Sequence, residues 1–190
     1  CTFPHEDIGN DPSAIRDFAQ AAENLGFSHI MIYDHVLGAV HAGREPRLEG
    51  PYTELTPFHE AFVTFGFLAA VTSRIELTTG IVILPQRQTV LAAKQAAEVD
   101  FLSRGRLRMA VGTGWNYVEY EGLGMEWDNR GSRYEEQITL LRKIGPKVDA
   151  IPSVLVAGLL SIAIALPMAW PLHAGIHDIP ESLLHRVIQR

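Results

Sequence analysis

The chain has 190 residues, of which 47% are hydrophobic and 20% are charged, and its formal net charge is -6. This balance is typical of a globular protein with one core and excludes a disordered chain. The chain has 16 basic and 22 acidic residues. A nucleic-acid-binding protein usually carries an excess of basic residues in a patch, so we expect no nucleic-acid partner. Cys1 is the single cysteine, which excludes an intrachain disulfide and a cysteine-based metal cluster and favours a cytoplasmic location.

Charge divides the chain into two parts. Residues 147–190 contain three basic and three acidic side chains, so the whole net charge lies in residues 1–146. No charged residue occurs between Asp149 and Asp178. We therefore predict a first domain over residues 1–145 and a separate apolar segment over residues 146–190.

The first domain begins with a helical pattern followed by a strand pattern. Asp11-Pro12 offers a helix cap and a proline for the first turn, and apolar residues continue at helical spacing up to Gly26. The apolar run 30–33 then predicts a strand buried on both faces. After a loop of about twenty residues, Thr56-Pro57 predicts the start of a second helix.

The same alternation occurs twice more. Residues 75–84 and 107–112 are predicted as strands, and residues 90–102 between them as a helix ended by Gly105. The sequence Ser132-Arg133-Tyr134-Glu135 has the spacing of a capping box and predicts the start of the last helix. With Thr2-Phe3 as the end of a first strand, the domain contains about four βα units.

This pattern predicts an α/β fold with a parallel sheet. Four units fit either half of an eight-stranded barrel or a small doubly wound sheet, and in both architectures functional residues gather at the carboxyl ends of the strands. Those ends contain Pro4-His5, Asp34-His35, Thr79-Gly80-Ile81 and Gly112-Thr113-Gly114-Trp115-Asn116. We expect no metal site, because metal-ligand spacing is absent from the histidines His5, His41 and His59.

Two of these strand ends have side chains suited to chemistry or ligand binding. His35 next to Asp34 places an imidazole, which titrates near neutral pH, beside a carboxylate; the alternative is a loop-capping Asp and an exposed His. Gly112-Thr113-Gly114 resembles half of a phosphate-binding loop. Trp115 and Asn116 offer an aromatic face and an amide to a planar ligand, the alternative for Trp115 being ordinary packing.

An ordered set of motifs runs through the first domain. The motifs are Asp34-His35-Val36, Thr78-Thr79-Gly80-Ile81, Ser103-Arg104-Gly105-Arg106, Gly112-Thr113-Gly114-Trp115-Asn116 and Glu119-Tyr120. Together they resemble the bacterial luciferase-like superfamily (LLM class), in particular its deazaflavin (F420)-dependent oxidoreductases. The resemblance extends over residues 1–145.

The resemblance implies a (β/α)8 TIM barrel that binds F420 or FMN across the strand ends and transfers hydride between the ring and a small organic substrate. On this sequence it places Asp34 beside the ring together with His35, the candidate catalytic proton donor or charge stabiliser. It also implies a cis, non-proline peptide at Gly80-Ile81, where Ile81 and Gly80 support the ring. The remaining cofactor contacts that it implies are Thr79, Gly112, Thr113, Gly114, Trp115 and Asn116.

The length predicts a partial barrel, because a complete one needs at least about 200 residues. We therefore expect a domain truncated after its first half, without the later strands that supply the cofactor's phosphate site in this family. Truncation is a reason to expect weakened or lost activity. A half-barrel has two open sheet edges, which favour pairing with a second copy as a homodimer.

The apolar segment contains a candidate membrane helix. Residues 151–172 include no charged residue and are long enough to span a bilayer. Arg142, Lys143 and Lys147 precede this stretch and predict a helix that anchors the chain in the inner membrane with the first domain in the cytoplasm. The alternative is a buried fifth strand followed by a core helix broken by proline. The segment also weakly resembles a permease helix, which would indicate a fusion or a frameshift.

Three functions remain open from the sequence. The first is an oxidoreductase that passes hydride between F420 and a small organic substrate, and the second is an FMN-dependent luciferase-like monooxygenase. The third is a non-catalytic half-barrel that is tethered to a membrane or forms oligomers. The strand-end residues do not separate F420 from FMN, because both present a planar tricyclic ring to the same pocket.

Overall fold

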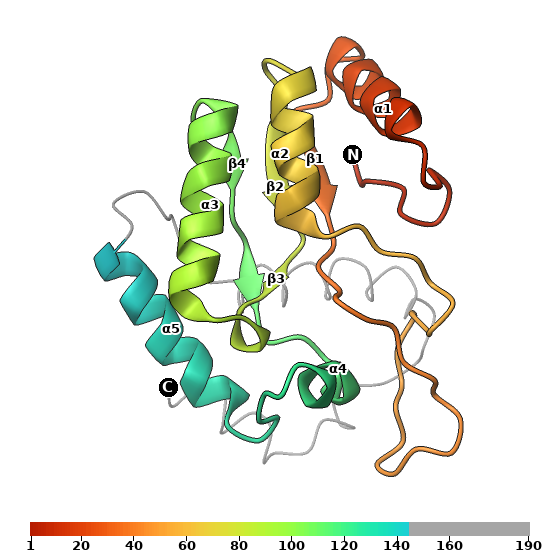
Figure 1. Cartoon of the computed structure of the whole chain (residues 1–190), viewed down its shortest axis with the longest axis vertical. Helices are drawn as coiled ribbons and strands as arrows, with labels where there is room; N and C mark the ends of the chain where they lie inside the picture. Colours follow the sequence, from red (N-terminus) through yellow and green to blue (C-terminus); the bar gives the residue numbers. More distant parts are fainter. Residues whose placement is uncertain (145–190) are drawn as a thin grey trace, which may run out of the picture. The chain divides into compact units, whose positions relative to one another are not determined.

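The computed structural model describes residues 1–144 (Figure 1). Its central sheet is parallel and contains β1 (His29–Ile32), β2 (Glu76–Thr79) and β4 (Leu107–Arg108) in that order. A bridge joins Thr2 to Met31 of β1, so the first residues of the chain occupy the strand position before β1. The strands therefore follow one another in chain order, as in a (β/α) barrel, whereas a doubly wound sheet reverses its order.

Two of the predicted strands are each divided in two. β2 continues after a break into β3 (Val82–Ile83), and β4 continues into β5 (Val111–Gly112), which pairs with β3 in parallel. The first break contains the cis peptide between Gly80 and Ile81 that the resemblance implied. The two halves of the sheet are linked here, because the Thr79 hydroxyl donates a hydrogen bond of 2.6 Å to the carbonyl of Ala110.

Four helices pack in a row, each against the next: α1 (Pro12–Asn24), α2 (Ala61–Val71), α3 (Thr89–Ser103) and α5 (Arg130–Ile144). Figure 1 shows α2 and α3 side by side in front of the strands. The core between helices and sheet is apolar and includes Phe3, Ile30, Phe65, Leu68 and Leu77, all buried almost completely. The alternation of elements predicted an α/β fold, and the arrangement is of the TIM-barrel type that the resemblance implied.

The start of α1 agrees with the sequence prediction. Asp11 caps the helix, since its carboxylate accepts a hydrogen bond of 2.8 Å from the Ser13 N–H, and Pro12 occupies the first turn.

The predicted start of α2 at Thr56-Pro57 is wrong. The helix begins at Ala61 and is capped by Glu60. The preceding residues serve tertiary contacts instead, because the His59 N–H donates to Nδ1 of His5 and the Phe58 ring packs against His35.

The predicted capping box at the start of α5 is also wrong. The helix begins at Arg130, so Ser132 lies in its first turn and its hydroxyl donates to the carbonyl of Asn129. At this start of the helix, the Arg130 guanidinium lies over the Trp127 ring and donates to the Trp127 carbonyl. Two short helices, η1 (Leu84–Gln86) and α4 (Tyr117–Gly122), had no predicted counterpart.

Two charged side chains hold the segment that leads into β2. The Glu23 carboxylate accepts the backbone N–H groups of Ser73, Arg74 and Ile75. The Arg106 guanidinium donates to the carbonyls of Ala69, Thr72 and Ile75. Together they join the end of α1 and the start of β4 to the turn between α2 and β2.

No helix within residues 1–144 is long and apolar enough to cross a membrane. The segment 146–190, with the candidate membrane span at 151–172, lies outside the described residues.

Candidate active site

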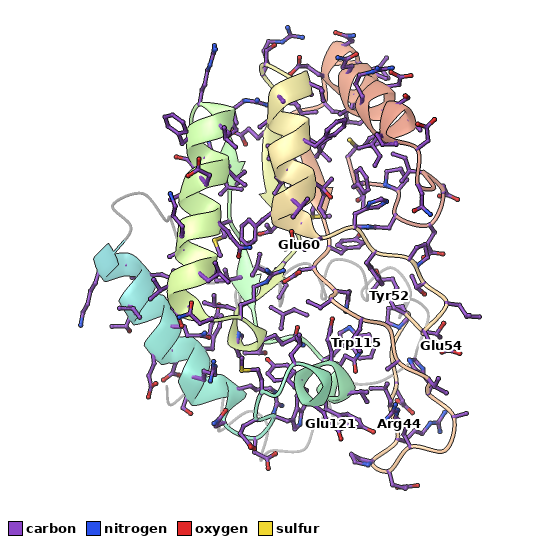
Figure 2. All side chains as sticks on the ribbon, viewed as in Figure 1. Arg44, Tyr52, Glu54, Glu60, Trp115 and Glu121 are labelled. Atoms are coloured by element: carbon purple, nitrogen blue, oxygen red, sulfur yellow. The ribbon has the colours of Figure 1, made fainter. Side chains whose placement is uncertain are left out.

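The candidate site lies where three strands end. Asp34 and His35 follow β1 after a single residue, η1 follows β3, and the segment 113–116 joins β5 to α4. The long connection from β1 to α2 runs past these ends and carries Tyr52 (Figure 2), whose ring, like that of Trp115, packs against His35. Carboxyl ends of parallel strands are where barrel enzymes place their functional groups.

Asp34 is buried and paired with a cation. Its Oδ1 accepts a hydrogen bond of 2.6 Å from Nη2 of Arg87, and its Oδ2 accepts from Nε of Arg87 and from the Ile83 N–H. Arg87 also contacts Glu60, the cap of α2, at 3.0 Å. Burial alone would lower the pKa of Arg87, but the two carboxylates raise it above its ordinary value. Asp34 thus ties β1 to the segment after the cis peptide and to α2.

His35 is paired with a different carboxylate. Its Nδ1 lies 3.2 Å from Oε2 of Glu119 in α4, and the Glu119 side chain has no exposed surface. The other carboxylate oxygen, Oε1, accepts the backbone N–H groups of Val36 and Leu37. Burial would raise the pKa of Glu119, but the hydrogen bonds from His35 and from these two N–H groups lower it below its ordinary value.

Aromatic rings surround the imidazole of His35. The ring centroids of Phe58, Tyr52 and Trp115 lie 4.7, 5.1 and 6.0 Å from that of His35. Burial, followed by the neighbouring Tyr33 and Glu6, raises the pKa of Tyr52, which therefore stays protonated at neutral pH. The imidazole lies in a wall of flat, mostly uncharged side chains.

Glycine permits two close contacts in this wall. A Cβ atom at Gly50 would lie 2.2 Å from the Trp115 ring, so the ring lies directly on the backbone of the β1–α2 connection. A Cβ atom at Gly112 would lie 2.2 Å from Cδ1 of Ile81, so the cis-peptide segment packs against the end of β5. Two of the predicted cofactor contacts, Ile81 and Gly112, are thereby brought together.

The other predicted residues after β5 have structural partners. The Thr113 carbonyl accepts a hydrogen bond from the Tyr120 hydroxyl, and Gly114 has a φ of 68°, in the left-handed region. Asn116 is buried and caps α4, because its side-chain oxygen accepts the N–H groups of Val118 and Glu119. Asn116 thereby fixes the helix that carries the partner of His35.

His5 lies at the edge of the same cluster. Its Nδ1 accepts the His59 N–H at 3.1 Å, and its ring stacks with that of Tyr33. Burial, together with the neighbouring His59 and His35, lowers the pKa of His5 to about 4, so His5 is neutral at pH 7. Its Nε2 is buried and has no hydrogen-bond partner among the described residues.

Sequence reasoning missed four residues of the site: Arg87, Glu119, Tyr52 and Phe58. Glu119 stands in one of the motifs of the resemblance, but no local pattern connects it with His35, 84 residues earlier. Arg87 is likewise 53 residues from Asp34. The adjacency of Asp34 and His35 suggested that these two act together, whereas in the structure each has its own distant partner.

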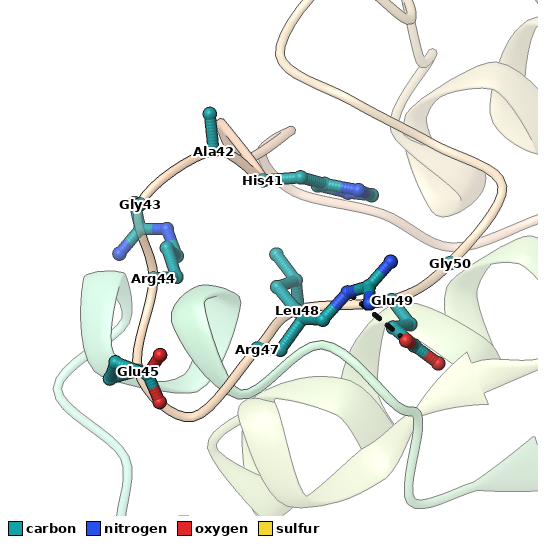
Figure 3. A pocket seen from close by; sticks show the side chains of 9 residues that line it. All are labelled: His41, Ala42, Gly43, Arg44, Glu45, Arg47, Leu48, Glu49 and Gly50. Atoms are coloured by element: carbon teal, nitrogen blue, oxygen red, sulfur yellow. Dashed lines mark ion pairs between the residues drawn. The ribbon is translucent and has the colours of Figure 1, made fainter.

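A shallow hollow lies beside the site, in the loop of residues 41–50 (Figure 3). Its volume is about 630 Å³, and an exposed ion pair between Arg47 and Glu49 lies on its rim. His41 connects it to the site, since its Nε2 contacts the Tyr52 carbonyl and its ring lies 6.3 Å from that of Trp115.

Comparison with known sequences identifies relatives of this chain. Residues 2–150 match the family described as luciferase-like monooxygenase. An uncharacterized protein of Mycobacterium tuberculosis is 32% identical over 144 residues, which are 74% of this chain and 50% of that protein. Pyrimidine monooxygenase RutA of Pantoea ananatis is 39% identical over 93 residues, 45% of this chain and 24% of RutA. The chain thus spans about half the length of the first of these relatives, and less of the second.

A solved structure has a similar fold. The oxygenating constituent of 3,6-diketocamphane monooxygenase from Pseudomonas putida, solved in complex with FMN, matches 75% of this chain with a TM-score of 0.58 and 17% identity. The match covers 38% of that protein's chain. At this identity the likeness shows a shared fold.

Proposed function

This chain belongs to the luciferase-like monooxygenase family, and from that premise we propose that its strand ends bind the tricyclic ring of a flavin-type cofactor. The proposed activity is oxidoreduction of a small organic substrate at that ring. The cofactor, when bound, would supply the exchange of a hydride. The observation that supports this proposal is the position of His35, a titratable imidazole held by a buried carboxylate inside an aromatic wall.

The side chains present suit a flat ring. Ring systems gain affinity from contact with planar apolar groups, and Phe58, Tyr52 and Trp115 provide them within one cluster. The neutral ring of His5 adds a buried Nε2 that lacks a partner among residues 1–144 and can bind a polar atom. Arg87 is paired with two carboxylates, so its guanidinium is not a free cation for the ring.

Each residue then has a defined part in the proposed reaction. His35 exchanges a proton with the substrate, because imidazole is suited to proton transfer near neutral pH. Asp34 and Arg87 hold the segment of Gly80 and Ile81 in place against β1. Trp115 closes the pocket on the side of the β1–α2 connection.

F420 is the first candidate cofactor, because the motif set of this chain resembles the deazaflavin-dependent branch of the family. FMN is the second candidate. It is favoured by one relative and one structural neighbour, since RutA is named a monooxygenase and the diketocamphane enzyme was solved with FMN. The third candidate, a non-catalytic half-barrel, predicts that neither cofactor binds.

A fluorescence titration separates these candidates. The full chain is titrated with F420 and, in parallel, with FMN. We expect saturable binding of one of them, weakened about fivefold in Trp115→Ala because aromatic contacts contribute about 1 kcal/mol. His29→Ala, at the amino end of β1, is the control for His35→Ala, which we expect to abolish turnover while the fold is preserved.

Two results would overturn the proposal. Absence of binding of both cofactors at millimolar protein would leave the non-catalytic half-barrel as the function. Equal affinity of the wild type and Trp115→Ala for a bound cofactor would place the ring somewhere other than the strand ends.

A further inference from the structure

We propose that Glu119 is a positioning residue that fixes the tautomer of His35, so that Nδ1 keeps its proton and Nε2 is the atom that exchanges one. The tautomer follows from the geometry of this chain alone. The identity of the group that exchanges a proton with Nε2 rests on the proposed function.

The contacts of Glu119 determine which partner donates. An ionised carboxylate only accepts hydrogen bonds. The backbone N–H groups of Val36 and Leu37 donate to Oε1, and the Gln86 amide donates to Oε2 at 3.3 Å. Nδ1 of His35 is the fourth partner, so it must carry a hydrogen to bond with Oε2.

Within residues 1–144, Glu119 is the carboxylate that pairs with His35. The titratable groups that face it are Glu119 from α4, Tyr52 from the β1–α2 connection and His5 from the first strand position. Tyr52 and His5 are both neutral at pH 7, for the reasons given above. Asp34, its neighbour in sequence, is turned to Arg87. Among the described residues, the negative charge at His35 is therefore that of Glu119.

The proton balance follows from this pairing. In the doubly protonated ring, Nε2 gives its proton to a basic oxygen of the substrate, and the ring becomes neutral. Nδ1 keeps its hydrogen and its hydrogen bond to Glu119. In the reverse direction, the lone pair of Nε2 takes the proton back. Glu119 remains ionised throughout, because the hydrogen bonds from its four donors outweigh the burial that alone would raise its pKa.

Glu119→Gln should reverse the tautomer. Two backbone N–H groups face the Oε1 position, so the amide oxygen of the glutamine takes that place. Its NH2 group then faces Nδ1 of His35, which must accept. The proton of the neutral ring consequently moves to Nε2, and the ring can no longer take up a proton there.

Nitrogen-15 NMR of the full chain with labelled histidines identifies the tautomer of His35 directly, because the two tautomers of neutral imidazole differ in the chemical shifts of their ring nitrogens. We expect the Nδ1–H form of His35 in the wild type and in Glu121→Gln, and the Nε2–H form in Glu119→Gln. Glu121 lies on the same helix with its side chain exposed (Figure 2) and is the matched control. Loss of the His35 signal in His35→Ala provides the assignment.

Turnover gives the second measurement. Glu119→Gln should lose at least about tenfold in kcat, with the acid limb of the pH profile displaced, while Glu119→Asp recovers part of the loss. An Nε2–H tautomer in the wild type overturns this inference without any variant having to fold. Failure of cofactor binding with the predicted tautomers intact overturns the proposed function alone.

Discussion

The ion pair between Arg87 and Asp34 is the most consequential single contact at the strand ends, since the Asp34 side chain is almost fully buried and that of Arg87 is mostly buried. Removing one partner of a buried pair leaves the other charge unpaired, which costs about 3–5 kcal/mol. We expect Arg87→Met to lower the free energy of unfolding by that amount in chemical denaturation. Arg108→Met breaks an exposed pair with Glu76 instead and should cost at most about 1 kcal/mol.

A double variant separates the charge from the packing. Asn at position 34 keeps an oxygen for the Ile83 N–H but carries no charge. The double variant Arg87→Met with Asp34→Asn should therefore be more stable than Arg87→Met alone. Strictly additive losses in the double-mutant cycle would contradict a coupled, buried pair.

The carboxylate of Glu23 holds the segment that leads into β2. It accepts three backbone N–H groups at the entry to β2, and although burial raises its pKa, these bonds lower it from 4.5 to about 2. A lowered pKa contributes stability that is complete above pH 4.5 and is lost as the pH falls through 2.

The pH dependence of unfolding tests this contribution. Glu23→Gln should be less stable than the wild type at neutral pH, with the difference shrinking between pH 4.5 and 2, as followed by thermal unfolding. Asp17→Asn on the same helix removes an exposed pair with Arg16 and should show little change. A constant difference between wild type and Glu23→Gln down to pH 2 would contradict the low pKa.

The elements that the sequence predicted well are those whose signals are local. Asp11 and Pro12 act within one turn, so the start of α1 was predictable. The start of α2 was not, because Phe58 and His59 are committed to His5 and His35, which come from other strand ends. A propensity scale has no term for such distant contacts.

The candidate site also contains residues that could be predicted from the sequence and residues that could not. The strand-end positions of His35 and Trp115 were predictable, because a buried strand and the residues after it are read from one short window. Glu119 and Arg87 were not, because their significance depends on partners 84 and 53 residues away. A recurrent motif can mark such residues, but only the fold explains what they do.

At the scale of the whole molecule, the sheet of residues 1–144 has two edges. Within these residues β4 pairs with β2 alone, and the first strand position pairs only with β1. Open edges favour addition of further strands. We propose that a second copy pairs with them, so the full chain should have twice the mass of the 21.0 kDa monomer in analytical ultracentrifugation at micromolar concentrations. A monomer across that range would contradict this pairing.

The contact between Trp115 and Gly50 constrains how the family can vary. The indole occupies the space that any side chain at position 50 would need, so neither position can change freely. Relatives that carry a larger residue at position 50 should carry a smaller one at position 115, and the two columns of an alignment should covary. Where that exchange has occurred, the aromatic wall beside His35 would be completed by the loop instead of the indole, and a different set of ligands would fit.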